Sequence, residues 1–105
     1  MRASADSLRL RQLIAQNRDS IGEVFRQYGA TNPRLFGSVA RGDAHEHSDI
    51  DIMVDIADTK GSTIMKLAGI SESLRRLLSV RVDVVTPAVL REKVSAEAKK
   101  ELVAI

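Results

Sequence analysis

The chain has 105 residues, so we expect residues 1–105 to form a single domain around one hydrophobic core. Its apolar residues, 44% of the sequence, form no run near the roughly 18 residues that span a membrane, and the lack of cysteine excludes disulfides and thiolate metal sites. The formal net charge is only +2, and one Tyr and two Phe are available to stack on bases, so we do not expect direct nucleic-acid binding.

The N-terminal part of the chain is predicted to be helical. Its first residues contain no apolar signal core, which leaves the cytoplasm as the expected location. Apolar residues then recur at helical spacing, which predicts a helix over residues 6–28 with a candidate break at residues 17–19. Gly29 is expected to end this helix, and the segment "PRLFGS" predicts a short buried strand after Pro33.

The middle of the chain combines a Gly-Ser turn with an acidic strand. The segment "SVARG" predicts one turn of helix that ends at Gly42, and the polar segment "DAHEHS" predicts a loop after it. The next segment, "DIDIMVDI", alternates between two faces with the period of a half-buried strand. One face carries Ile50, Ile52 and Val54, and the other carries Asp49, Asp51, Met53 and Asp55. We therefore expect the polar face of this strand to be acidic.

The last part of the chain is predicted to contain a long helix, a second acidic strand and further helix. Apolar spacing predicts a helix from about residue 62 to residue 79. The segment "VRVDVV" predicts a strand in which Asp83 lies on the face opposite Val82 and Val84. The Thr-Pro pair at residues 86–87 suits the start of a helix, and the remainder of the chain is expected to be largely helical.

The acids of the two predicted strands form a candidate metal site. Asp49 and Asp51 are two residues apart on one strand, so their side chains project to the same side, about 6 to 7 Å apart along the chain. If the second acidic strand lies in the same sheet, Asp83 can join them. Three carboxylates offer the all-oxygen environment that Mg²⁺ prefers, and Mg²⁺ in such a site binds together with substrate phosphates.

The Gly-Ser turn is a candidate phosphate site. Gly37 permits a tight turn from strand to helix, Ser38 offers a hydroxyl, and the amides at the start of the following helix attract anions. Arg41 lies one helical turn after Ser38 and can contact either a triphosphate or a nearby acidic side chain, and both options stay open. His45 and His47 lie in the polar loop without another evident ligand, so we expect them to be solvated.

The arrangement of Gly37-Ser38, ten further residues, and then Asp49-x-Asp51 resembles the signature of the DNA polymerase β-like nucleotidyltransferase superfamily. The fuller string "FGSVARGDAHEHSDIDIMV" is similar to that of the minimal members, the MNT-domain proteins. The resemblance extends to "VDVVTP", where family members place a third acid after a long helix. It implies an α/β (α+β) fold, in which a small mixed β-sheet carries helices on one face.

The same resemblance implies a role for each of the candidate residues. Asp49 and Asp51 would bind two catalytic Mg²⁺ ions, and Asp83 would complete the metal site and help to deprotonate the attacking hydroxyl. Gly37 and Ser38 would hold the triphosphate of ATP.

Proteins similar to this chain serve as antitoxins beside HEPN-domain ribonuclease toxins, and they transfer AMP from ATP to a tyrosine hydroxyl of the toxin. The resemblance thus implies an ATP- and Mg²⁺-dependent protein adenylyltransferase with a HEPN-domain toxin as its partner. Two alternatives are a binding-only antitoxin that blocks its toxin sterically and a nucleotidyltransferase for a small molecule such as an antibiotic. The intact acids argue against the first, and the expected absence of an added helical domain for the acceptor argues against the second.

Overall fold

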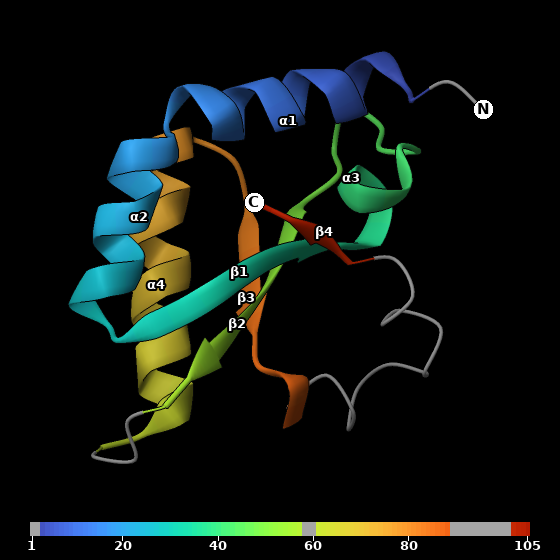
Figure 1. Cartoon of the computed structure of the whole chain (residues 1–105). Helices are drawn as coiled ribbons and strands as arrows, with labels where there is room; N and C mark the ends of the chain where they lie inside the picture. The colour runs from blue at the N-terminus through green and yellow to red at the C-terminus, as the bar shows by residue number, and fades with distance from the viewer. Residues whose placement is uncertain (1–2, 58–60, 89–101) are drawn as a thin grey trace.

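A computed structural model describes residues 3–57, 61–88 and 102–105. The elements follow along the chain as α1 (Ala5–Gln16), α2 (Arg18–Gln27), β1 (Ala30–Phe36), α3 (Gly37–Arg41), β2 (Ile50–Ile56), α4 (Thr63–Leu78), β3 (Val82–Val85) and β4 (Val103–Ala104) (Figure 1). The strands form one sheet in the order β3-β2-β1-β4. Strand β1 is antiparallel to both of its neighbours, and β2 is parallel to β3. This mixed sheet with its helices confirms the predicted fold class.

The long N-terminal helix is interrupted where the sequence indicated a break. Helix α1 ends at Gln16 and α2 begins at Arg18. Between them, the side-chain amide of Asn17 donates a 2.9 Å hydrogen bond to the carbonyl of Leu13. A side chain that bonds to the backbone in this way competes with continuation of the helix. Gly29 then follows the end of α2 with φ of +69°, the left-handed conformation that glycine adopts at helix ends.

Strand β1 is longer than predicted. We expected a strand after Pro33, but β1 begins at Ala30 and runs through the proline. Pro33 has no N–H to give to the ladder, and the register with β2 shifts between Thr31 and Arg34. The strand continues on both sides of this irregularity, because Ala30 and Thr31 find partners at the far end of β2. The proline therefore interrupts the ladder without ending the strand.

Helix α4 connects β2 to β3 across the sheet. It has nearly its predicted bounds: the Ser62 hydroxyl accepts the Met65 amide at its start, and Ser79 closes its end with φ of +56°. Parallel strands need such a crossover connection. As a result, β2 and β3 begin at the same edge of the sheet, and the acids near their starts are brought together.

The C-terminal prediction is wrong in part. Residues 87–88 are helical, as predicted, whereas the expected helix over residues 89–101 lies outside the described residues. Residues 103–104, which we also expected to be helical, instead form β4 against Arg34 and Leu35 of β1. The outer edge of β1 offers N–H and C=O groups that a returning segment can pair with, and this long-range option leaves no local signal in the sequence.

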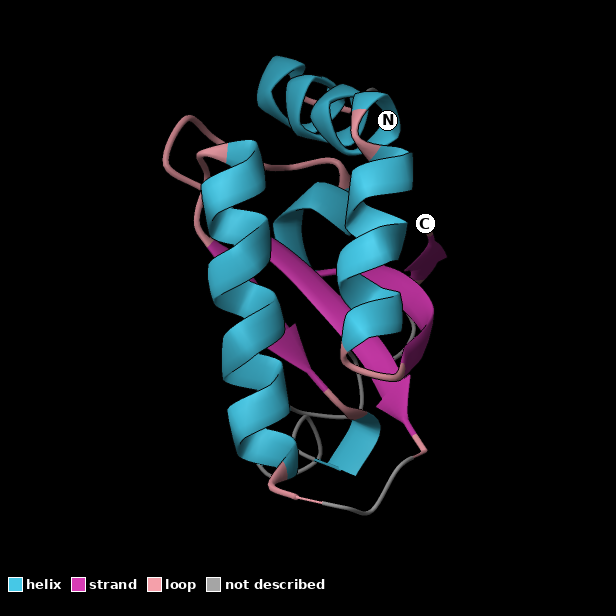
Figure 2. Cartoon of the chain, turned by 90° about the vertical axis from the view of Figure 1, so that its left-hand side faces the viewer, coloured by secondary structure: helices cyan, strands magenta, loops and turns pink. Residues whose placement is uncertain are grey.

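Helices α2 and α4 lie side by side and cover one face of the sheet (Figure 2). Their apolar stripes meet the inward face of β2 in the main hydrophobic core. The side chains in this core with no more than 1% exposure include Leu10, Ile21, Val39, Ile50, Ile52, Val54, Ile70 and Leu74. Burial of this size is the main favourable contribution to folding. In the ranges that the structure describes, no helix combines the length and apolarity that a membrane crossing requires.

Candidate functional site

The three candidate acids lie on neighbouring strands, at the edge where β2 and β3 begin. Asp51 and Asp83 are directly opposite each other in the parallel register, which places their Cα atoms about 5 Å apart. Asp49 immediately precedes β2 and lies two residues before Asp51. The crossover by α4 thus brings together acids that are more than 30 residues apart in the sequence.

Gly37 lies directly against Asp51. Phe36, the last residue of β1, is the register partner of Asp51, and the chain then turns at Gly37 with φ of +73°. A Cβ atom at residue 37 would overlap Oδ2 of Asp51 and lie 3.2 Å from its Cγ. The position therefore requires glycine twice, once for its backbone conformation and once for the close approach of the carboxylate. The Gly-Ser turn and the acidic strand belong to one site.

The electrostatic environment of Asp51 reflects this crowding. Burial, followed by the negative charges of Asp83 and Asp49, raises the pKa of Asp51 to about 6, and the nearby Arg41 guanidinium partly opposes the shift. Both causes disfavour the ionised carboxylate. A divalent cation or another positive group at this position would favour it. The site therefore holds negative charge that a bound cation could stabilise.

This shift predicts how stability depends on pH in metal-free solution. Because the folded pKa of Asp51 is raised, the folded protein binds the proton more tightly, and its stability falls as the pH rises from about 4 to about 6. We expect Asp51→Asn to be about 1 to 2 kcal/mol more stable than the parent at pH 7, with this gain shrinking toward zero near pH 4. Urea unfolding of both proteins in EDTA across this pH range measures it, and a gain that does not change with pH would contradict the assignment.

The flanks of the acid cluster carry two further features. The Arg81 Nε atom lies 3.9 Å from Oδ1 of Asp49, although the arginine side chain is 84% exposed, so this is a weak surface ion pair. On the other side, Asp83 lines a surface groove of about 200 Å³ between α4 and β3, together with Ile64 and Ala68.

Arg41 and Ser38 lie on α3, next to the acids. The two alternatives for Arg41 were a triphosphate contact and an ion pair, and the structure shows a 3.1 Å ion pair between its Nε and Asp43. Both side chains of this pair are about half exposed, and Arg41 still influences Asp51 electrostatically. The structure therefore shows the ion-pair alternative, and the triphosphate contact stays a prediction. Ser38 follows Gly37 in the first turn of α3 and is partly exposed.

Three other polar residues near the motif, His45, His47 and Asp55, were considered as further members of the site. His45 and His47 are exposed in the loop, where His47 pairs with Glu46 at 3.3 Å. Asp55 lies four residues beyond Asp51 on β2 and pairs with Arg34 at 3.2 Å. These side chains have local partners, and Glu46 and His47 also line a surface pocket of about 380 Å³ together with Asp49.

The acidic strand face also carries a small apolar cluster. Met53 was expected on this face beside the acids, and it is 1% exposed and packs with Phe36 and Val85, apart from the main core. Met53 and Val85 follow Asp51 and Asp83 by two residues and are register partners, and Phe36 is the register partner of Asp51. The three acids therefore lie next to this apolar cluster, which we call the apolar floor of the site.

The residues present suit Mg²⁺ in chemistry, although their side chains do not converge on one point. In the ranges that the structure describes, no three His, Asp or Glu side chains converge closely enough to ligate one metal ion. Asp49, Asp51 and Asp83 nevertheless provide hard oxygen donors on adjacent strands, and the charges of the other two act on Asp51. Rotation of these side chains toward a common point would be needed to complete a metal site.

Comparisons with known proteins agree with this arrangement. The sequence pattern of the family described as "Nucleotidyltransferase domain" matches residues 20–105. The chain is 33% identical over 81 residues to the protein adenylyltransferase MntA of Thermococcus cleftensis, which covers 77% of this chain and 80% of that relative.

Two solved structures resemble the fold. The first is described as a "putative minimal nucleotidyltransferase"; it has 31% sequence identity and a TM-score of 0.65, over 90% of this chain and 92% of the other. The second is a toxin-antitoxin crystal structure with AMP-PNP, with 32% identity and a TM-score of 0.55 over 67% of this chain and 56% of the other. At 31% and 32% sequence identity, the two structures resemble this chain in sequence as well as in fold.

Proposed function

This chain belongs to the nucleotidyltransferase domain family, and from that premise we propose that it is an antitoxin that transfers AMP from ATP to a tyrosine hydroxyl of a HEPN-domain toxin. Membership confirms the predicted resemblance and the predicted class of enzyme, a nucleotidyltransferase. The acceptor, the partner and the metal requirement are the proposed part. We also propose that residues 1–105 act as a single domain in a cytoplasmic complex with the toxin.

One observation carries the proposal: the Gly37 turn is packed against Asp51, which lies in register with Asp83. A nucleotidyl transfer must bind a triphosphate, offset its negative charge at the α-phosphate and remove a proton from the attacking hydroxyl. A Gly-Ser turn supports the first task. A set of carboxylates supports the other two, because it would hold a cation that offsets the phosphate charge and one of its members can accept the proton. In this structure the Gly-Ser turn and the carboxylate of Asp51 are in direct contact.

The proposed reaction assigns a task to each residue. Gly37 and Ser38 bind the triphosphate through an amide and a hydroxyl, and Arg41 can add a positive charge. Asp49, Asp51 and Asp83 would hold Mg²⁺, which supplies neutralisation of phosphate charge when bound. The tyrosine oxygen attacks the α-phosphorus, the bond to the β-phosphate oxygen breaks, and pyrophosphate leaves. Asp83 accepts the phenolic proton, which a tyrosine of pKa near 10 gives up more readily than an aliphatic alcohol.

The choice of a protein acceptor is supported by the relatives. The similar chain from Thermococcus cleftensis is named a protein adenylyltransferase, and one similar structure is a toxin-antitoxin complex with an ATP analogue. The HEPN domain and the tyrosine are inferred from the resemblance of the Gly-Ser and Asp-x-Asp motif to MNT-domain antitoxins. Together these support a folded partner that presents its hydroxyl to the site.

The position of the label in ATP tests the reaction directly. We would incubate the protein with its toxin, Mg²⁺ and ATP labelled at either the α- or the γ-phosphate. Nucleotidyl transfer gives labelled toxin with the α-label and none with the γ-label. Toxin labelled from the γ-phosphate would mean phosphoryl transfer, and toxin labelled from neither would leave the protein without the proposed activity.

ATP binding is expected to depend on Mg²⁺. The carboxylates near Gly37 repel a bare triphosphate, and a metal ion bound between them and the phosphates removes this repulsion. We therefore expect ATP to bind about tenfold or more tightly in Mg²⁺ than in EDTA. Titration calorimetry measures both affinities. Equal affinities would remove the metal from the mechanism.

A further inference from the structure

The helix that carries the Gly-Ser turn is too short to be stable alone. Helix α3 has five residues, fewer than isolated helices need to form in water. Gly37 at its start and Gly42 after its end both have left-handed φ, +73° and +87°. The carbonyl of Ser38 accepts hydrogen bonds from the amides of Gly42 at 2.9 Å and Asp43 at 3.0 Å. Other groups must hold the rest of this helix in place.

Arg11 of α1 binds the next two carbonyls of α3. Its Nε donates to the Val39 carbonyl at 3.1 Å, and its Nη2 donates to the Ala40 carbonyl at 2.7 Å. The last carbonyls of a helix have no partner within the helix, and a positive group there also interacts favourably with the helix dipole. Arg11 is partly buried, and its guanidinium therefore supplies the hydrogen bonds that the amides of a further helical turn would donate to these carbonyls.

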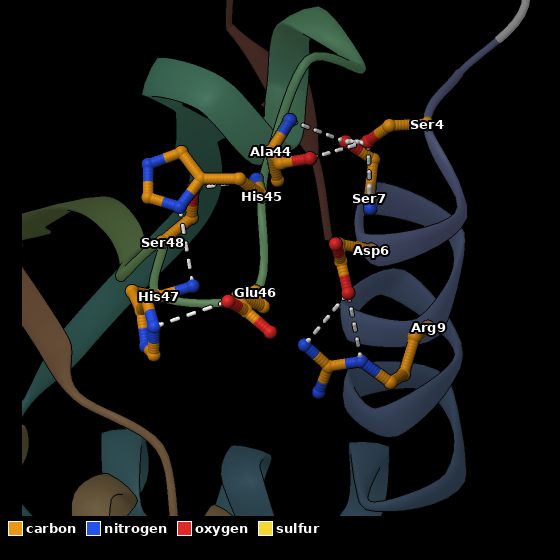
Figure 3. A network of polar contacts seen from close by, with 9 residues as sticks. All are labelled: Ser4, Asp6, Ser7, Arg9, Ala44, His45, Glu46, His47 and Ser48. Carbon is orange, nitrogen blue, oxygen red and sulfur yellow. Dashed lines mark hydrogen bonds and ion pairs between the residues drawn. The ribbon is translucent and has the colours of Figure 1, made fainter.

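Two serines at the start of α1 hold the loop after α3 (Figure 3). The Ser4 hydroxyl donates to the carbonyl of Ala44 at 2.7 Å, and the Ser7 hydroxyl accepts the amide of Ala44 at 2.8 Å. The two serine hydroxyls are 2.8 Å apart, and Ser7 and Ala44 are buried. The Ser4 amide also donates to the Gly42 carbonyl at 2.7 Å. These bonds fix the chain between the Gly-Ser turn and the strand that carries the acids.

We propose that α1 is a positioning element of the nucleotide site and that Arg11 is its main positioning residue. Arg11 holds the carboxyl end of α3, so that the Gly37 turn at the other end stays against Asp51. The family pattern matches residues 20–105, so α1 lies before the matched region. The inference rests on the proposed function in one respect, the binding of the triphosphate at Gly37 and Ser38.

Substitutions of Arg11 test the inference. Arg11→Met keeps an unbranched stem but removes both donors, whereas Arg11→Lys keeps the charge and one donor group. We expect Arg11→Met to speed amide exchange at Gly42, Asp43 and Ala44 about tenfold while the amides of β2 and α4 stay protected. MgATP binding should weaken about tenfold, and Arg11→Lys should recover part of both effects. Arg18→Met, an exposed arginine at the start of α2, is the matched control and should change neither.

The outcomes separate this inference from the proposed function. Amide exchange is measured without nucleotide, so a parent protein that fails to bind MgATP contradicts the proposed function while exchange still decides the role of Arg11. The inference is overturned if Arg11→Met changes exchange at residues 42–44 no more than Arg18→Met does. It is also overturned if exchange rises equally over the whole sheet and Arg11→Lys recovers nothing, since that is a loss of global stability. If Arg11→Met does not fold, the same measurements on Arg11→Lys decide.

Discussion

Replacing Asp49 and Asp51 together by asparagine is expected to lower AMP transfer by orders of magnitude while the protein remains folded. Asparagine keeps nearly the same shape but removes the charges that would hold the metal ions beside the phosphates. The fold should tolerate the change, and its stability at neutral pH should rise, because burial and like charges already disfavour ionised Asp51. Transfer rates with MgATP and unfolding in urea measure the two effects on the same protein samples.

Asp55→Asn is the matched control for this pair. Asp55 lies on the same strand, four residues beyond Asp51, and pairs with the largely buried side chain of Arg34. The same chemical change at residue 55 removes one charge from β2 without touching the Gly37 turn. We expect near-parental transfer from this variant. If Asp55→Asn lost as much activity as the double variant, net charge on the strand would explain the loss and the metal assignment would be wrong.

Gly37→Ala is expected to abolish MgATP binding and to destabilise the fold by about 2 to 4 kcal/mol. The backbone at residue 37 is left-handed, and the new methyl group would overlap the carboxylate of Asp51. Either the turn or the carboxylate must move, and both belong to the proposed nucleotide site. Calorimetric titration with MgATP and thermal unfolding measure the two losses.

Alanine variants at two other glycines distinguish the effect of backbone strain from the effect of contact with Asp51. Gly29 has a similar φ of +69°, but a Cβ there meets nothing within 4 Å, so Gly29→Ala carries the strain without the overlap. Gly22 lies within α2 with nothing within 4 Å and no left-handed φ, so Gly22→Ala should be neutral or stabilising. Both variants should bind MgATP as the parent does. Loss of binding in Gly29→Ala equal to that in Gly37→Ala would show that strain alone accounts for the effect.

Local patterns were sufficient to predict most of the elements. The signals for α4, its apolar residues at helical spacing and the serines at its two ends, all lie within one short stretch of sequence. The predicted helix therefore differs little from the observed one. The features that were predicted wrongly depend on distant partners. Strand β1 extends through Pro33 because β2 supplies partners beyond the proline, and residues 103–104 form a strand because β1 has an open edge. No spacing within either segment encodes these partners.

The placement of the candidate residues next to one another was predictable from the sequence, whereas the physical detail of their contacts was not. The Gly-Ser and Asp-x-Asp spacing indicated which residues belong together, and the predicted strand with Asp83 indicated the third acid. The overlap that excludes a side chain at Gly37 and the apolar floor with Met53 depend on the β1–β2 register. The bonds from Arg11 to α3 join residues 28 and 29 positions apart and follow no periodic pattern. Tertiary packing determines these features.

The mass of the toxin tests the central claim most directly. The protein, its cognate HEPN-domain toxin, ATP and Mg²⁺ are incubated together, and the intact toxin is then weighed by mass spectrometry. We predict that the toxin gains the mass of one or more AMP groups and that the Asp49→Asn/Asp51→Asn variant adds none. A toxin that gains no mass, yet is silenced at one-to-one mixing equally well by the parent and by this variant, would contradict the account and establish a steric antitoxin instead.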